Sequence, residues 1–322
     1  MGGRDSLVGG VDLGGTKIQT VVLKNHQVVG SSRVETPQTG ADAVLAAIAG
    51  SVRTSLEVAG DSLSDLAAIG VGTPGTIDES NGSVSNSPNV PGFDAGPVPL
   101  AEELSKALGG ADVRVDNDVR VAVRGEWKRG AGRPYRDLLG VFVGTGVGGG
   151  LVLDGNLRLG RGAAGEIGHT IVKDGGRRCG CGKEGHLESY AGRARIEATA
   201  RKWQAEGRKT RLFQIMEKKG RDRLTSGVIA EALTEHDQVA IELIDEAVWA
   251  LGIALANAAN LLDLEAVIIG GGLGDRLGKP FVDRVAEAAG PRLHVPERPP
   301  TFLTTELGDL SGAVGAAVLA GG

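Results

Sequence analysis

The sequence is poor in cysteine, in aromatic residues and in net charge. Cysteine occurs only at Cys179 and Cys181, and the single residue between them leaves poor geometry for a stabilising disulfide. Reduced thiols or a metal site explain such a pair better. Aromatic residues make up 3% of the chain, so the core must be built from Val, Leu, Ile and Ala. This composition is typical of a buried, mainly parallel sheet flanked by helices.

The charge balance and the apolar pattern argue against two classes of protein. Lys and Arg number 35 against 40 Asp and Glu, which gives a formal charge of −5 and disfavours a nucleic-acid binder that works by phosphate neutralisation. No apolar run is long enough to span a membrane, and residues 1–6 lack the pattern of a signal peptide. We therefore expect a cytoplasmic protein with no nucleic-acid or membrane partner.

Glycine, in contrast, is abundant, with 53 residues among 322, and it gathers between apolar segments. The length suggests two domains, each with its own core. Strands are predicted at 7–13, 18–23, 27–34, 66–71, 113–115, 139–143, 149–153 and 266–269. Helices are predicted at 41–56, 100–108, 119–129, 187–205, 226–233, 240–262, 280–289 and 311–319. Hairpins mixed with strand–helix alternation indicate an α/β fold.

Two segments share one pattern, residues 8–30 and residues 139–160. Each predicts a strand, a Gly/Thr turn, a second strand, a short turn and a third strand. Gly-rich hairpins also arise independently, but the repeated order favours a duplicated half-molecule. We therefore expect two similar domains whose Gly/Thr turns meet across a cleft, where ligands usually bind.

The first Gly/Thr turn has the features of a phosphate cradle. Gly14 and Gly15 let the backbone approach an anion and aim its amides at it, while Thr16 adds a hydroxyl and Lys17 a charge. Asp12 ends the preceding strand, where it could hold a hydrated Mg²⁺. An ordinary tight hairpin is the alternative.

A second turn and a third glycine cluster support the phosphate interpretation. Gly144, Thr145 and Gly146 form the second turn, and two such turns suit a nucleotide with a long phosphate tail. Neither turn has P-loop spacing, and each leads into a strand where a dinucleotide fingerprint would lead into a helix. Gly271 and Gly272 follow the strand at 266–269, either to approach an adenine or ribose or simply to enter a helix.

Asp118 is the candidate for proton transfer. It follows a predicted strand and precedes a helical pattern, and residues beyond the carboxyl ends of strands face the ligand crevice in open α/β sheets. A carboxylate there could accept a proton from a hydroxyl that attacks a phosphoryl group, while Asn117 binds a neighbouring hydroxyl. The alternative is that Asp118 only caps the helix.

Four potential metal ligands lie close together in the sequence. These ligands are His169, Cys179, Cys181 and His186. Two thiolates and two imidazoles suit tetrahedral Zn²⁺, and four protein ligands imply a structural ion. Reduced thiols beside unrelated histidines are the alternative. Glu166 and Glu188 flank the cluster and could bind a polyhydroxylated ligand, or they could be solvated helix-terminal charges.

Taken together, the motifs resemble the ROK family of sugar kinases and sugar-responsive repressors. In chain order they are VDLGGTK, GVGTPGTID at Gly70–Asp78, SNSPNVPGF at Ser85–Phe93, VDNDVRVAV, GVFVGTGVGGG, GEIGH with CGCGKEGH, and VIIGGGL. The resemblance covers nearly the whole chain. It implies an actin-like (ribonuclease H-like) ATPase fold with two similar α/β domains around a central cleft. The implied domains are residues 1–118, completed by a C-terminal helix at about 306–322, and residues 119–305 with the zinc motif.

The resemblance also implies ATP-dependent phosphorylation of a hexose, glucose above all, with Asp118 as general base. The implied sugar ligands are Asn89, Asn117, Glu166, His169 and Glu188, with Gly75 and Thr76 lining the pocket. Asp12 to Lys17 match the family's first phosphate motif, and Gly144, Thr145 and Gly146 match its second. The family's zinc motif normally ends in a third cysteine, where this chain has His186.

The family contains other functions that remain open. Another hexose could be the substrate, namely N-acetylmannosamine, mannose or fructose, and polyphosphate could replace ATP. A non-catalytic sugar sensor is a further alternative. We expect no repressor-type helix-turn-helix, because the first strand begins by Leu7. The resemblance also implies a homodimer or homotetramer.

Overall fold

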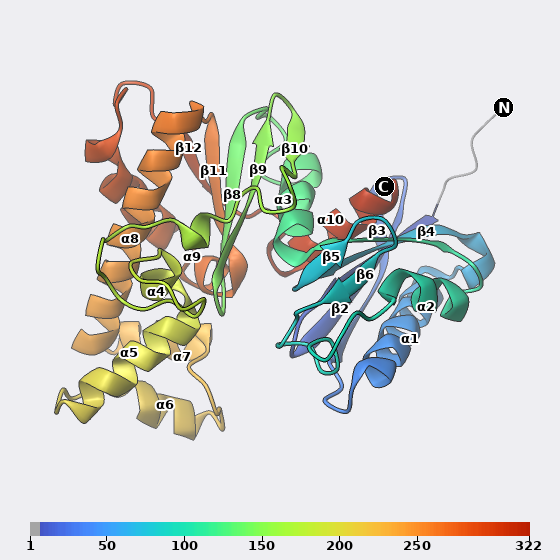
Figure 1. The fold of residues 1–322 in the computed structure, drawn as a ribbon, viewed down its shortest axis with the longest axis horizontal. Coiled ribbons are helices and arrows are strands. Elements are labelled where there is room, and N and C mark those ends of the chain that lie inside the picture. Colours follow the sequence, from blue (N-terminus) through green and yellow to red (C-terminus); the bar gives the residue numbers. More distant parts are fainter. Residues whose placement is uncertain (1–6) are drawn as a thin grey trace. The chain divides into compact units, whose positions relative to one another are not determined.

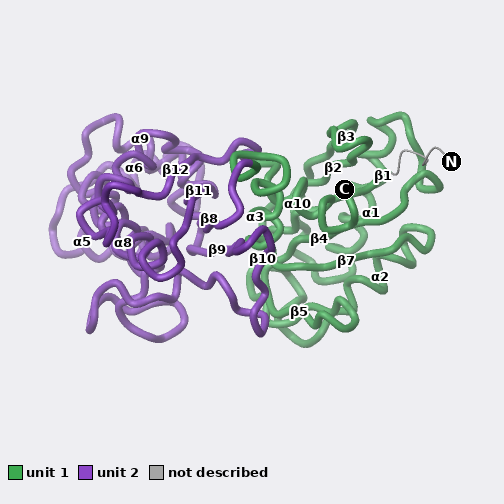
Figure 2. The backbone as a smooth tube through the Cα atoms, turned by 90° about the horizontal axis from the view of Figure 1, so that it is seen from above, with its two compact units in different colours: residues 1–133, 309–322 green, residues 134–308 purple. Residues whose placement is uncertain are grey.

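The computed structural model describes residues 7–322 (Figure 1). The expectation that residues 1–6 lack a signal peptide concerns residues outside this described range. The chain forms two compact units, residues 1–133 with 309–322 and residues 134–308 (Figure 2). Within residues 7–322, no helix has both the length and the apolar character that crossing a membrane requires.

The first unit contains a five-stranded sheet with the order β3-β2-β1-β4-β7. The strands are β1 (Leu7–Leu13), β2 (Lys17–Lys24), β3 (Gln27–Glu35), β4 (Leu66–Thr73) and β7 (Asp112–Asn117). The first three strands pair antiparallel, whereas β4 and β7 run parallel to β1. Its helices are α1 (Ala41–Ala59), α2 (Leu100–Ala107), α3 (Asp118–Arg129) and α10 (Ser311–Ala320), and a small sheet pairs β5 (Thr76–Asp78) with β6 (Ser83–Ser85).

Glycines in the central strands let helix α10 lie close against this sheet. A Cβ on Gly10 of β1 would lie 2.0 Å from the carbonyl oxygen of Ala313, and one on Gly70 of β4 would lie 1.7 Å from that of Ala316. Both separations are far inside van der Waals contact, so only glycine permits this packing. Part of the high glycine content is therefore explained by packing of a helix on a sheet.

Helix α3 belongs to the first unit, whereas the sequence analysis began the second domain at residue 119. The reason is its contact with α10, where a Cβ on Gly315 would lie 1.6 Å from the carbonyl oxygen of Val121 and one on Gly125 would lie 2.4 Å from that of Ser311. The two helix backbones touch through these glycines, which places the boundary after Arg133.

The second unit repeats the topology of the first. Its sheet has the order β10-β9-β8-β11-β12, with three antiparallel strands followed by two parallel to β8. The strands are β8 (Leu138–Val143), β9 (Val147–Leu153), β10 (Asn156–Arg158), β11 (Ala266–Gly270) and β12 (Thr301–Thr304). The helices are α4 (Glu188–Ala191), α5 (Arg193–Ala205), α6 (Leu212–Lys218), α7 (Ser226–Thr234), α8 (Gln238–Leu262) and α9 (Gly271–Ala289). The prediction of two similar α/β halves is confirmed.

Two predicted helices have different bounds in the structure. The helix predicted at 187–205 is divided into α4 and α5, because Gly192 between them is extended, with φ −68° and ψ 128°. The helix predicted at 280–289 is the second part of α9, which begins at Gly271 and kinks at Gly278, where φ is 61°. Strands β5, β6 and β12 have no counterpart among the predicted strands, because they have only three or four residues and so lack a periodic pattern.

Candidate functional site

The first Gly/Thr turn connects β1 to β2 and is held by backbone hydrogen bonds. The amide of Gly14 donates to the carbonyl of Lys17 at 3.0 Å, and the Thr36 hydroxyl donates to the carbonyl of Gly14 at 2.6 Å. A Cβ on Gly15 would lie 2.2 Å from the carbonyl oxygen of Asn89. Glycine therefore lets the turn contact the segment that carries the predicted sugar ligand Asn89.

Asp12 lies at the end of β1, partly buried, with its carboxyl beside the first turn of α10. A Cβ on Gly312 would lie 2.6 Å from the Asp12 Cγ, so the glycine leaves space for this carboxyl. Burial, with the neighbouring charges of Asp118 and Asp309, raises the pKa of Asp12 to about 7 against the opposing effect of Lys17. A carboxyl in these surroundings favours a bound cation, which would stabilise its charged form.

Replacing Asp12 with asparagine is expected to stabilise the protein at alkaline pH. The native carboxyl has a pKa of about 7, against an ordinary value of 3.8 in an unfolded chain, so between these pH values the native state binds more protons than the unfolded state. The free energy of unfolding of the wild type therefore falls as pH rises through this range. Asparagine does not titrate, so the variant avoids this loss. Its free energy of unfolding above pH 7 should exceed that of the wild type by up to about 4 kcal/mol, since each unit of pKa shift corresponds to about 1.4 kcal/mol.

Urea unfolding at pH 8 and at pH 4 measures this difference. The gain should be largest at pH 8 and should disappear as pH falls toward 4. Asp112→Asn is the matched control, because Asp112 lies exposed at the opposite end of the sheet in an ion pair with Arg114. A stability gain that does not change with pH would contradict the assigned cause.

Asp118 and Asn117 lie where β7 ends and α3 begins. The N-cap is Asn117, whose Oδ1 accepts from the amides of Val119 and Arg120 at 3.0 and 3.1 Å. The alternative that Asp118 serves as the cap is therefore wrong. The Asn117 Nδ2 donates to the Asp118 Oδ1 at 2.9 Å, so the cap also orients this carboxylate. Asp118 remains close enough to Asp12 to affect its pKa.

Lys17 points to an acidic side chain at the start of the C-terminal segment. Its Nζ lies 3.1 Å from the Asp309 Oδ1, and Arg33 lies 3.4 Å from the other oxygen of the same carboxylate. The Asp309 carboxyl is 65% exposed. Exposed ion pairs of this kind contribute about 0–1 kcal/mol, so an anionic ligand can take the place of Asp309 at little cost.

Gly75 and Thr76 lie at the start of β5 in the first unit. Gly75 has φ 116°, and a Cβ there would lie 2.7 Å from the carbonyl oxygen of Ser85, so the position requires glycine. The Thr76 hydroxyl accepts a long hydrogen bond of 3.4 Å from Asn86. Thr76 and Asn89 are both exposed, which leaves their side chains accessible to a ligand.

The second Gly/Thr turn lies between β8 and β9 and is fixed by α4 and α5. The carbonyl of Gly144 accepts from the amide of Arg193, and that of Thr145 accepts from the amide of Ala194, both at 3.0 Å. A Cβ on Gly146 would lie 2.3 Å from the Glu188 Oε2. This turn is therefore positioned by residues more than forty places further along the chain, which also include the predicted sugar ligand Glu188.

The third glycine cluster opens helix α9. Gly271 has φ 81°, and a Cβ there would lie 2.7 Å from the amide nitrogen of Val143, which immediately precedes the second turn. The helix-entry interpretation is thus confirmed. The same contact brings Gly271 and the exposed Gly272 next to the end of β8 where the second turn begins.

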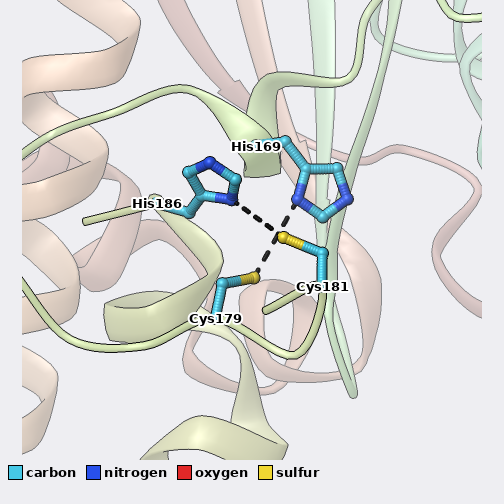
Figure 3. Close-up of side chains that lie close together, drawn as sticks. All are labelled: His169, Cys179, Cys181 and His186. Carbon is cyan, nitrogen blue, oxygen red and sulfur yellow. Dashed lines mark hydrogen bonds between the residues drawn. The ribbon is translucent and has the colours of Figure 1, made fainter. Parts of the chain in front are cut away.

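The four predicted metal ligands converge in the second unit (Figure 3). Their ligand atoms all lie within 4.8 Å of one another. The Cys181 Sγ lies 3.3 Å from the His186 Nδ1, and the Cys179 Sγ lies 4.0 Å from the His169 Nδ1. Such separations fit a tetrahedral ion with ligand distances of about 2.0–2.3 Å. The residues present therefore fit Zn²⁺.

Burial shifts the pKa values of two side chains in this cluster. It raises the pKa of the Cys179 thiol to about 11, and it lowers the pKa of His186 below its usual value. The lowered pKa favours the neutral imidazole that a metal ligand must be, whereas the thiol would lose its proton on binding the ion.

Glu188 connects the metal cluster to the second turn. Its Oε2 accepts from the amide of Val147 at 3.0 Å, and its Oε1 accepts from the Cys179 Sγ at 3.4 Å. The other predicted sugar ligands of this unit, Glu166 and His169, lie exposed at the two ends of one short helical turn, Ile167–His169 with its cap. The structure thus brings the metal cluster, the carboxylates and the second turn together within one unit.

Known proteins resemble this chain over most of its length. The sequence pattern of the ROK family matches residues 8–322. A glucokinase of Halalkalibacterium halodurans is 36% identical over 291 residues, which cover 88% of this chain and 86% of that protein. A glucokinase of Streptomyces coelicolor is 33% identical over 317 residues, which cover 97% and 96%.

A solved structure confirms the architecture. The ROK family glucokinase from Streptomyces griseus, crystallised with glucose and AMPPNP, matches with a TM-score of 0.80 and 33% identity over 98% of this chain and 99% of that one. The two α/β sheets and this match confirm the predicted actin-like ATPase fold. On the sequence pattern, the relatives and the fold together, this chain belongs to the ROK family.

Proposed function

We propose that this protein is an ATP-dependent hexose kinase that converts glucose to glucose 6-phosphate. The observation that carries the proposal is the placement of Asp118 in the first unit, where Asn117 orients its carboxylate and Asp12 lies close enough to feel its charge. Relatives at 33–36% identity over most of the chain are glucokinases, which supports both the reaction and the sugar.

The proposed chemistry divides between the two carboxylates. Asp118 accepts the proton of the C6 hydroxyl as the oxygen attacks the γ-phosphorus of ATP, and the bond to the bridging oxygen of ADP breaks. Asp12 holds the Mg²⁺ that neutralises charge on the phosphates when it is bound. The orientation of Asp118 by Asn117 supports the first role, and the raised pKa of Asp12 supports the second.

We assign the remaining site residues by the same chemistry. The two Gly/Thr turns bind the phosphates through their amides, with Thr16 and Lys17 in the first and Thr145 in the second. Gly271 and Gly272 line the part of the site that binds the nucleoside. The sugar hydroxyls are bound by the exposed or partly buried polar side chains, with Gly75 and Thr76 beside them: Asn89, Asn117, Glu166, His169 and Glu188.

The capping bonds limit what Asn117 can contribute to sugar binding. Its Oδ1 already accepts two amides, so only its Nδ2 group has a hydrogen left to donate to a sugar oxygen. Glu188 is similarly engaged through both oxygens. A metal-bound Cys179 thiolate can no longer donate, which would leave the Glu188 Oε1 available to a sugar hydroxyl.

We further propose that Zn²⁺ is bound by His169, Cys179, Cys181 and His186 as a structural ion. When bound, it supplies a fixed geometry for the segment that carries Glu166, His169 and Glu188. The convergence of the four ligand atoms supports this assignment. The family resemblance supports a cytoplasmic protein without nucleic-acid partners. It also supports a homodimer or homotetramer, and light scattering of the purified protein tests this oligomeric state.

A coupled assay of ADP release across a panel of sugars tests the function. We expect glucose to give the highest kcat/KM among glucose, N-acetylmannosamine, mannose and fructose. A higher value for one of the others would reassign the substrate, and no sugar-dependent ADP release would favour the non-catalytic sensor. Replacing ATP with polyphosphate in a parallel assay of glucose 6-phosphate formation determines the phosphoryl donor.

A further inference from the structure

One guanidinium group in the second unit has only neutral partners. The Arg193 Nη2 donates to the Thr145 Oγ1 at 3.0 Å, and its Nη1 donates to the Ser226 Oγ at 3.3 Å. Among residues 7–322, no carboxylate lies within ion-pair distance of this half-buried side chain. Glu197, whose charge acts on Arg193, pairs with Arg201 and accepts a hydrogen bond from the amide of Leu224.

The surroundings of Arg193 connect two of the proposed nucleotide segments. Thr145 belongs to the second Gly/Thr turn, and the Arg193 amide itself donates to the carbonyl of Gly144 in that turn. On the other side, a Cβ on Gly272 would lie 3.7 Å from the Arg193 Nη1 and 3.6 Å from the Ser226 Oγ. The guanidinium therefore lies next to the turn assigned to phosphate and next to the first turn of α9.

The charge at this position is unfavourable without an anion. Burial lowers the pKa of Arg193, and the positive charge of Arg223 lowers it further. A half-buried guanidinium with hydroxyls as its only direct partners loses hydration without gaining a counter-ion, and Arg223 adds a like charge nearby. A phosphate group would supply that counter-ion and accept two parallel hydrogen bonds from the guanidinium.

We propose that Arg193 binds the phosphate tail of the nucleotide beside the second Gly/Thr turn, with Arg223 adding to the positive field. Thr145 accepts from Arg193 in the protein alone, and the phosphate takes over that hydrogen bond when the nucleotide binds. The Thr145 hydroxyl is then available as a donor to the same phosphate. The inference rests on the proposed kinase function, which it extends with a residue outside the motifs identified in the sequence.

Arg193→Met tests the inference, because it removes the charge and keeps the aliphatic length. Calorimetric titration with Mg²⁺ and AMPPNP should show binding weakened about 10–100-fold, the usual cost of losing a hydrogen bond to a charged group. Adenosine, which has no phosphate, should bind as it does to the wild type. Arg201→Met is the matched control on the same helix, where the arginine is 50% exposed and paired with Glu197, and it should change neither affinity.

Other outcomes separate this inference from a structural role and from the function itself. A brace between α5 and α7 would weaken AMPPNP and adenosine alike, and Ser226→Ala would reproduce that loss, which would overturn the inference. Equal AMPPNP affinity for Arg193→Met and wild type would also overturn it while the kinase proposal stands. A wild type that binds no AMPPNP would instead overturn the proposed function.

A charge-conserving variant keeps the test decisive if the methionine variant does not fold. Arg193→Lys retains the charge but loses the two parallel hydrogen bonds, so its AMPPNP affinity should fall between those of the wild type and Arg193→Met. Its binding should also weaken as salt concentration rises, as for the wild type. Wild-type affinity for AMPPNP in Arg193→Lys, with no salt dependence in either protein, would contradict phosphate binding by this side chain.

Discussion

Asp118→Ala is expected to lower kcat by roughly 10²–10⁴-fold, the usual contribution of a positioned general base. The carboxylate accepts from Asn117 and from the amide of Val119, both at 2.9 Å, so its orientation is fixed by the start of α3. Alanine removes the proton acceptor, but Asn117 still caps the helix, and we expect the variant to stay folded. Steady-state kinetics with glucose and MgATP measure the effect.

Two controls show whether a loss of kcat comes from the missing base or from a general effect of the substitution. Asp112→Ala removes an exposed carboxylate from the other end of β7, and it should leave kcat unchanged. The melting temperature of Asp118→Ala should remain near that of the wild type. Turnover close to the wild-type rate in a folded Asp118→Ala protein would refute the assignment of the base.

Cys179→Ser is expected to remove nearly all bound zinc. The wild type should carry about one Zn²⁺ per chain, and structural zinc sites contribute directly to folding because they depend on a complete set of four ligands. Elemental analysis after purification and dialysis measures the content, and thermal unfolding should show a lower melting temperature for the variant. The loss of zinc also removes the fixed geometry of the segment that carries Glu166, His169 and Glu188, so glucose affinity should fall as well.

His186 distinguishes this site from the usual family motif. His186→Cys should retain zinc, because a third thiolate restores that motif, whereas His186→Ala should lose it. His294→Ala is the control, since His294 is an exposed histidine outside the cluster. A folded wild type that contains no zinc after growth with added zinc would eliminate the metal assignment.

The sequence by itself determined the features that depend on local pattern. Apolar runs interrupted by glycine define β1 and β11 with their correct starts, and the repeated strand–turn–strand pattern predicts two halves of one topology. The four metal ligands lie within eighteen residues of sequence, so a short loop is enough to bring them together. Such features can be predicted from sequence because residues that are close along the chain must also lie close together in space.

Only the tertiary structure decided the features that depend on contacts between distant segments. Gly125 and Gly315 are indistinguishable from other helical glycines in the sequence, yet their backbone contact assigns α3 to the first unit. The cap of α3 is decided by the Asn117 Oδ1, which accepts from the amides of Val119 and Arg120. Arg193 belongs to no motif, and only the approach of Thr145, Ser226 and Gly272 from three other segments shows a charge without a counter-ion.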